Sequence, residues 1–242
     1  LGLAIRMRYF DLASELINQM PATDLTFQNN KGESYVYLAS KAGALDLVLQ
    51  MADKYFASRG RLHDFIFSDI DLKNNAGERA LHVAADRRMA ALLEEQYNKS
   101  IVMPTFYRFT FLADAKGRNF IHAAANDSRV DVIRWAVEKY CGRSSWETEG
   151  LSIVTYPTAF VMQAGRLYQT HIGDFGWFGW EKKFNWQDAD GNTPLHLAAR
   201  AGNSEAVRVI GGCEWTDFAL ANNEGNLALH SFLKSIDPLD SN

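Results

Sequence analysis

Cysteine and proline are both scarce in this chain. Its 242 residues include two cysteines, Cys141 and Cys213, and five prolines. Two cysteines are too few to form a disulfide framework that replaces a hydrophobic core. They also lack the close spacing of a zinc-binding pair. The fold must therefore be held by ordinary packing, and 47% apolar residues are enough to build a core.

The sequence also lacks a large excess of charge and a long apolar run. Lys and Arg total 25 against 29 for Asp and Glu, a net charge of −4. This balance argues against affinity gained by neutralising nucleic-acid phosphates. No apolar run reaches the roughly 18 residues that span a bilayer, and no basic-then-apolar segment marks a signal peptide. We expect neither nucleic-acid binding nor membrane insertion.

Motifs of nucleotide binding and covalent catalysis are missing as well. The sequence has no P-loop, no dinucleotide fingerprint, no G-x-S-x-G elbow and no H-E-x-x-H helix. Asp174-Phe175-Gly176 matches three letters of the kinase metal-binding motif, but the other kinase signatures are absent. An enzyme would need a polar pocket among Asp174, His171, Glu147 and Glu149. We expect no enzyme activity, no cofactor and no metal ligands.

A repeated unit is what the sequence does contain. Its clearest copy runs from Asp188 to Ala199 and is followed by Gly202. Gly191 permits a tight turn, Thr193 can cap a helix, and Pro194 suits the first helical position, where no backbone donor is needed. The alanines and leucines that follow are spaced to face inward on one helix. The pattern predicts a turn, a helix, a second turn and a second helix.

The same frame recurs along the chain with decreasing regularity. Its glycine returns at Gly32, Gly77, Gly117 and Gly225, and its histidine occurs at His82, His122, His196 and His230. These units resemble the ankyrin repeat, which has a period of about 33 residues. The resemblance implies an all-α solenoid of helix-turn-helix units with short hairpin loops. It also implies that the four histidines are structural and form hydrogen bonds within and between repeats.

The resemblance predicts about six units in a single domain, residues 1–242. Residues 1–20 are expected to form an N-terminal capping unit and residues 221–242 a C-terminal one. Terminal units should turn a more polar face to water. Departures from the pattern occur at Tyr37, which replaces the histidine, and at Arg88 and Ser128, which replace the turn glycine. We expect those copies to be less regular.

One junction carries far more chain than the repeat needs. Between the fourth and fifth repeats, residues 142–185 form an insertion of roughly forty residues beyond the repeat length. Thr158–Ile172 fits either a β-hairpin or a short helix. Trp177, Phe178 and Trp180 alternate with glycine and fit either an anchor for a partner or packing against the array. Both pairs of alternatives stay open.

The two cysteines flank this insertion, each after a predicted second helix. Neighbouring repeats lie about 10 Å apart, wider than the roughly 4.4–6.8 Å between the Cα atoms of a bridged pair. An irregular loop would close that gap. The sequence therefore allows either a Cys141–Cys213 disulfide or two thiols, and the repeat spacing favours the thiols.

Ankyrin proteins bind partners through hairpin tips and the exposed side of the first helices, which together line a groove. The resemblance assigns protein binding here to Trp177, Phe178 and Trp180 of the insertion and to the groove residues Lys31, Glu33, Glu78, Arg87, Lys116, Arg118, Asp127, Asp190, Asn192 and Arg200. Their mixed charge suits a protein surface rather than a polyanion.

The function expected is the binding and inhibition of a partner enzyme, such as a hydrolase. Some bacterial ankyrin proteins protect the cell in this way, as immunity or self-protection proteins. The alternative is a scaffold that links two proteins without inhibiting either. We expect a monomer when the protein is free. The family default is the cytoplasm, while a chain that starts at Leu1 rather than Met leaves the bacterial periplasm open.

Overall fold

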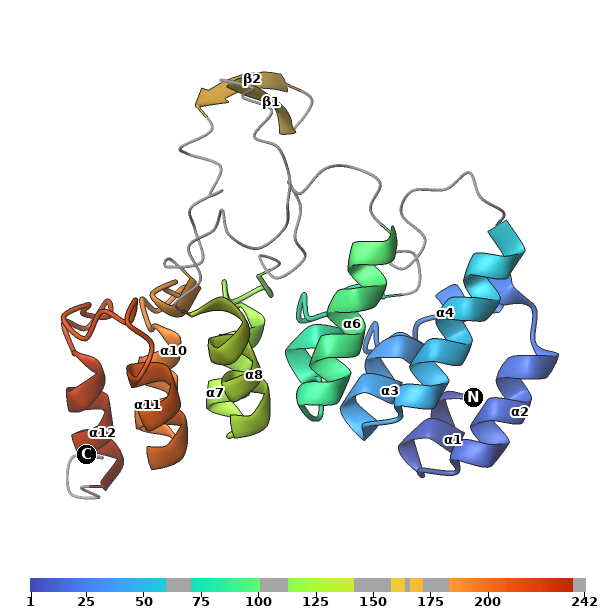
Figure 1. Ribbon diagram of the computed structural model, residues 1–242, viewed down its shortest axis with the longest axis horizontal. Coiled ribbons are helices and arrows are strands. Elements are labelled where there is room, and N and C mark those ends of the chain that lie inside the picture. The colour runs from blue at the N-terminus through green and yellow to red at the C-terminus, as the bar shows by residue number, and fades with distance from the viewer. Residues whose placement is uncertain (60–70, 101–112, 142–157, 164–165, 172–182, 237–242) are drawn as a thin grey trace.

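The structure is a computed structural model that describes residues 1–59, 71–100, 113–141, 158–163, 166–171 and 183–236. Helices stacked side by side make up most of the described chain (Figure 1). The pattern of turns and helices confirms the all-α, ankyrin-type fold expected from the sequence.

The helices form two layers that follow the chain in parallel (Figure 1). In the first layer each helix contacts the next, in the order α1 Gly2–Arg6, α3 Tyr35–Ala42, the 3₁₀ helix η2 Ala80–Val83, α7 Phe120–Asn126, α10 Pro194–Arg200 and α12 Ala228–Ile236. The second layer consists of α2 Phe10–Gln19, α4 Leu45–Arg59, α6 Arg87–Ser100, α8 Val130–Tyr140 and α11 Ser204–Gly211. A short 3₁₀ helix, η1 Ala22–Thr26, packs against α4.

Small residues let the two layers approach closely. Ala39, Ala124 and Ala198 occupy matching positions in α3, α7 and α10, and each is fully buried. Side chains of this size allow neighbouring helices to pack at short interaxial distances. The core is therefore one continuous strip between the layers, to which every repeat contributes.

The copies that depart from the repeat pattern do differ in backbone conformation. Ser128 takes a positive φ of 59°, close to the values of 74° and 65° at Gly43 and Gly202 in equivalent turns. Arg88 does not adopt this conformation, because it lies inside α6 instead of in a turn. The first helix of that repeat is reduced to the four-residue η2.

Part of the insertion is a β-hairpin, which decides between the two alternatives for that segment. Strand β1, Thr158–Gln163, pairs antiparallel with β2, Arg166–His171, in a register that places Thr158 opposite His171. The chain rejoins the array earlier than residue 185, because Lys183 and Phe184 are already buried.

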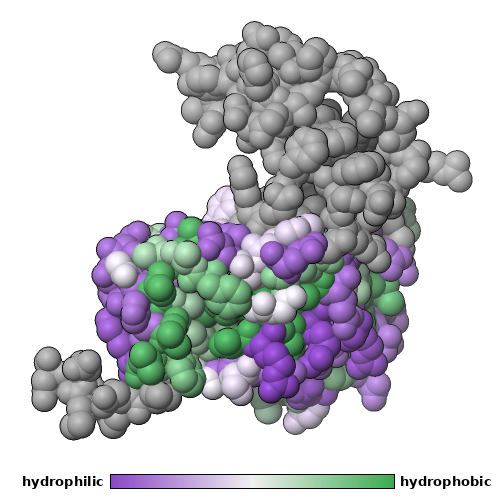
Figure 2. All heavy atoms as spheres, turned by 60° about the vertical axis from the view of Figure 1, so that its left-hand side comes forward, coloured by the Kyte–Doolittle hydropathy of each residue, from purple (hydrophilic) through white to green (hydrophobic). Residues whose placement is uncertain are grey.

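The terminal units differ from the expectation of polar outer faces. Leu3 is 74% exposed, and Met7 and Leu12 are more than half exposed. At the other end Leu229 and Leu233 of α12 lie open, and Figure 2 shows apolar side chains gathered on this face. At this end the reason is geometric, since no second helix packs against α12 within the described residues.

Candidate protein-binding surface

The hairpins that precede each first helix are built by one recurring side chain. In the clearest repeat, Asp188 Oδ1 accepts the backbone N–H of Asp190 at 3.0 Å and of Asn192 at 2.8 Å. These two bonds close the turn and set its width. The same pair of bonds is made by Asn29, Asn74, Asp114 and Asn222.

Neighbouring hairpins are linked backbone to backbone. The Ala189 N–H donates to the carbonyl of Lys116 at 2.8 Å, so the link continues directly across the insertion. The matching bonds elsewhere join Asn75 to Lys31, Ala115 to Ala76, and Asn223 to Asp190. The insertion therefore leaves the stacking of the array uninterrupted at the hairpins.

Glycine is required in these hairpins by both conformation and space. Gly191 has a φ of 76°, and a Cβ placed there would lie 2.6 Å from the backbone nitrogen of Asn223. Gly77 is in the same situation against Ala115, also at 2.6 Å. Gly225 has the same positive φ but nothing within 4 Å. The close approach thus reflects the presence of a following hairpin.

The repeat histidines tie each helix to the hairpin before it and to the hairpin after it. His122 Nδ1 accepts the N–H of Asn119 at 3.3 Å, and its Nε2 donates to the carbonyl of Asn192 at 3.0 Å. His82 and His196 make the equivalent pairs of bonds, and His230 makes the first bond from Leu227. Burial lowers the pKa of His122 to about 4, because a charged imidazole would lose its hydration there. A neutral ring with its proton on Nε2 satisfies both bonds.

Tyr37 occupies the position where the other repeats carry histidine. It contacts the next repeat through a chain of charged side chains instead of a backbone carbonyl. Its hydroxyl donates to Glu78 Oε2 at 2.8 Å, and Glu78 lies 3.5 Å from Arg118. Arg118 in turn pairs with Asp114 at 2.6 Å. Burial alone would raise the pKa of the Asp114 carboxyl, but the bonds from Arg118 outweigh burial and hold it below its usual value. Glu78 and Arg118 therefore serve the contact between repeats.

Five residues share an exposed position of the hairpins, two places after the turn-closing Asn or Asp. We call them the tip row: Lys31, Ala76, Lys116, Asp190 and Glu224. The charge of the row runs from basic near the N-terminus to acidic near the C-terminus. Because the hairpins are bonded to one another, these side chains stand on a rigid, regularly spaced support.

The structure separates the other residues assigned to binding into two groups. Asp127 and Arg200 are exposed at the ends of α7 and α10, as a groove contact requires. Asn192 is only 5% exposed, which corrects its assignment, because its carbonyl accepts from His122 inside the stack. Glu33 is also partly buried, and its carboxylate accepts hydrogen bonds from Arg6 and Asn29.

Arg87 lies elsewhere than expected. It begins α6 in the second layer and pairs with Glu138 of α8 at 2.9 Å, so it does not line the groove beside the first helices. Trp177, Phe178 and Trp180 of the insertion lie outside the described residues.

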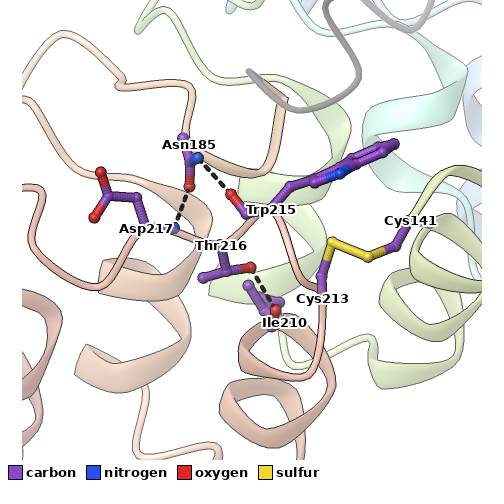
Figure 3. Close-up of a disulfide and its surroundings, with 7 residues drawn as sticks. All are labelled: Cys141, Asn185, Ile210, Cys213, Trp215, Thr216 and Asp217. Carbon is purple, nitrogen blue, oxygen red and sulfur yellow. Dashed lines mark hydrogen bonds between the residues drawn. A yellow bond between two sulfur atoms is a disulfide. The ribbon is translucent and has the colours of Figure 1, made fainter. Parts of the chain in front are cut away.

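A disulfide joins the two cysteines that flank the insertion. Cys141, after α8, bonds Cys213, after α11, and their Cα atoms are 5.6 Å apart (Figure 3). The repeat spacing had favoured two thiols, but Cys141 is already in an extended conformation and has left the helix. The two helix ends can therefore approach more closely than the helices themselves.

The loop that follows Cys213 is held by several further bonds (Figure 3). Asn185 donates to the carbonyl of Trp215 at 2.6 Å and accepts the N–H of Asp217 at 2.9 Å. Thr216 Oγ1 donates to the carbonyl of Ile210 at 2.6 Å. Sequence reasoning did not single out Asn185, because its partners are backbone groups 30 and 32 residues away that no local pattern reveals.

This loop surrounds an open pocket of about 650 Å³. Its lining includes Asn185, Glu214, Trp215, Asp217 and Phe218. The side chains of Trp215 and Asp217 leave the loop on opposite sides (Figure 3), and Trp215 packs partly against the core. The loop is thus anchored on one side and open on the other.

Trp186 is a second residue whose role the sequence patterns did not predict. Its indole nitrogen donates to the carbonyl of Gly117 at 2.9 Å, so it joins the two hairpins on either side of the insertion.

Across the described ranges no group of three His, Cys, Asp or Glu is placed to hold a metal ion. No helix in those ranges is long and apolar enough to cross a bilayer.

The comparison with protein families agrees with this geometry. The ankyrin repeat model matches residues 190–215, which cover the tip of one hairpin, α10, α11 and the start of the loop after Cys213. No curated protein matches the chain. Ankyrin repeats are typically non-catalytic protein-interaction modules, so the match indicates that the chain has protein partners.

Proposed function

We propose that this protein binds a partner enzyme through the tip row and the insertion, and inhibits it. The observation that carries the proposal is the tip row itself. Lys31 and Lys116 are exposed, and neither side chain makes an ion pair or hydrogen bond within the described residues. A folded chain gains little from such residues, whereas an interface gains specificity and association rate from them.

The support beneath the tip row favours tight binding. Rigid hairpins lose little conformational freedom when a partner docks, so less of the interaction energy is spent on ordering. The graded charge of the row suits a partner surface that is acidic at one end and basic at the other. A scaffold that links two proteins would use the same surface, with the insertion binding the second protein.

The disulfide bears on where such a partner would be found. Structural disulfides persist in oxidising compartments and are rare in reducing ones. We therefore propose an extracellular or periplasmic setting rather than the cytoplasm, with a secreted or periplasmic hydrolase as the partner class.

The decisive experiment is copurification from the source cells with four proteins in parallel. These are the intact chain, a deletion of residues 150–182, the charge-reversed Lys31→Glu/Lys116→Glu variant, and the control Arg88→Glu/Arg208→Glu. Arg88 and Arg208 are more than 70% exposed and lie away from the tip row. Partners are identified by mass, and the activity of any captured enzyme is then measured with the protein in excess.

We expect one enzyme to be captured by the intact chain and by the control, and lost with the reversed tip row. Its activity should fall on adding the intact chain. An enzyme that is captured but stays fully active would favour the scaffold. If the tip-row variant and the control variant capture the enzyme equally well, the tip row is not the binding surface.

A further inference from the structure

The loop after Cys213 carries two carboxylates that the fold does not use for pairing. Glu214 and Asp217 are both exposed, and neither forms an ion pair with any cation of the described residues. Both line the pocket beside the disulfide, whose described lining contains no Lys or Arg. The pocket is therefore matched to a cation.

An aromatic ring lies beside these carboxylates. Phe218 also lines the pocket and is 57% exposed, so part of its ring is open to a ligand. The ring is positioned against Gly211, where an added Cβ would lie 3.1 Å from its Cζ. A guanidinium group can stack on an aromatic face and bond a carboxylate with its edge at the same time.

The pocket is also rigid before any ligand arrives. The disulfide fixes one end of its loop, and Asn185 holds the middle by two hydrogen bonds. Asp217 Oδ1 accepts the N–H of Ala219 at 2.8 Å, which sets the orientation of that carboxylate. Groups that are already oriented cost less to order on binding.

We propose that this pocket binds an arginine side chain presented on an extended segment of the partner protein. The proposal rests on the proposed function, since it names the chemistry of the partner. The pocket is open to one side, so the segment that carries the arginine can continue past it. Arginine fits better than lysine because only its planar group combines stacking with paired bonds to a carboxylate.

The test uses the intact, oxidised protein and a small probe, N-acetyl-arginine methylamide. Binding is followed by chemical-shift changes of the Phe218 and Ala219 amides and the Asn185 side chain. The citrulline analogue has nearly the same shape without the charge and should bind at least about tenfold more weakly. The lysine analogue should bind several-fold more weakly, and added salt should weaken the arginine probe. Equal binding of the citrulline or the lysine analogue would overturn the assignment to arginine.

Substitutions of the lining residues test where the arginine probe binds. Glu214→Gln/Asp217→Asn should lower the affinity for the arginine probe by about tenfold or more. Phe218→Ala should lower it several-fold. The matched control Asp11→Asn/Asp53→Asn removes two exposed carboxylates of the N-terminal repeats and should bind the probe as the original chain does. Unchanged binding in the Glu214/Asp217 variant would overturn the proposal.

The same variant separates the two proposals in the copurification. If no enzyme is captured by the intact chain, the proposed function fails, while the arginine probe still decides the nature of the pocket. If an enzyme is captured equally by the intact chain and by Glu214→Gln/Asp217→Asn, the pocket is not its docking site and the inference fails alone.

Discussion

The repeat around Gly191 and the repeat around Gly77 begin with the same hairpin and continue with different helices. Gly191 and Gly77 have φ angles of 76° and 77°, and His196 and His82 bond the same kinds of backbone group. Yet α10 is a regular α-helix, whereas η2 is a four-residue 3₁₀ turn. The conformation of the hairpin and the hydrogen bonds of the histidine thus do not depend on the type of helix that follows.

The difference lies in where each repeat finds its capping groups. In the Gly191 repeat, Thr193 caps α10 from within. The Gly77 repeat has Arg79 at that position, and the N–H of Ala80 is satisfied from further away, by Asp71 at 2.9 Å. Arg129 of the next repeat donates to the carbonyls of His82 and Ala84, which the short turn leaves open. The irregular repeat therefore depends on Arg129 of its neighbour for hydrogen bonds to these carbonyls.

The largest effect should come from removing that support. Arg129→Met leaves two buried carbonyls without their charged donor, which should lower the free energy of unfolding by about 3 kcal/mol. The control Arg134→Met, on the helix that Arg129 precedes, breaks only a half-exposed ion pair with Glu205 and should cost less than about 1 kcal/mol. Urea unfolding of both variants measures the difference. Equal losses would show that Arg129 does not support the Gly77 repeat.

Acid should destabilise the protein through the buried histidine between the two repeats. The pKa of His122 is about 4 when folded against an unfolded value of 6.5, so the unfolded chain binds the proton first. Stability from this group is complete above pH 6.5 and is lost as the pH falls towards 4, by about 3 kcal/mol in total. In the His122→Gln variant, the free energy of unfolding should fall by about 3 kcal/mol less between pH 6.5 and pH 4. A profile unchanged by the substitution would show that His122 is not the group responsible.

Substitutions of the hairpin glycines should separate the cost of a positive φ from the cost of a steric clash with the next hairpin. Gly225→Ala strains only the backbone and should cost about 1 kcal/mol. Gly191→Ala adds a clash with the backbone of Asn223 and should cost about 2–3 kcal/mol. Thermal unfolding of the two variants gives the comparison, and equal shifts in Tm would mean that the hairpins can move apart without cost.

The smallest effect is expected from the internal cap. Thr193→Ala removes the hydroxyl that accepts the N–H of His196 and should cost about 1 kcal/mol. Thr193→Ser keeps the hydroxyl and should restore most of the loss. If the serine variant is as unstable as the alanine variant, the methyl group of Thr193 matters more than its cap.

The fold could be predicted because its signals are local. Gly191, Thr193, Pro194 and His196 each act within a few residues, so their spacing alone indicates the hairpin and the helix after it. The expected irregularity of the copy with Arg88 also follows from the missing turn glycine. A sequence with such signals in most repeats fixes the order of the elements before any long-range contact is considered.

The candidate site was less accessible to prediction because its contacts are distant in sequence. Asn192 looks like a surface residue by its place in a hairpin, but it is buried and bonded to His122 of the preceding repeat and to Asn222 of the following hairpin. Cys141 and Cys213 were placed by the spacing of ideal helices, whereas the bridge forms between the chain ends just beyond them. Asn185 and Arg129 bond backbone groups of other repeats, which carry no sequence signal at all.

The disulfide has a consequence for proteolysis. Its two cysteines are 72 residues apart in sequence, so the bond closes a covalent ring that contains the whole insertion and the Gly191 repeat. A protease that cuts once between residues 142 and 182 would open the ring without dividing the molecule. The two pieces would migrate together on a gel until a reductant was added, and a tether pulling on the two chain ends would load the sulfur bond instead of the insertion.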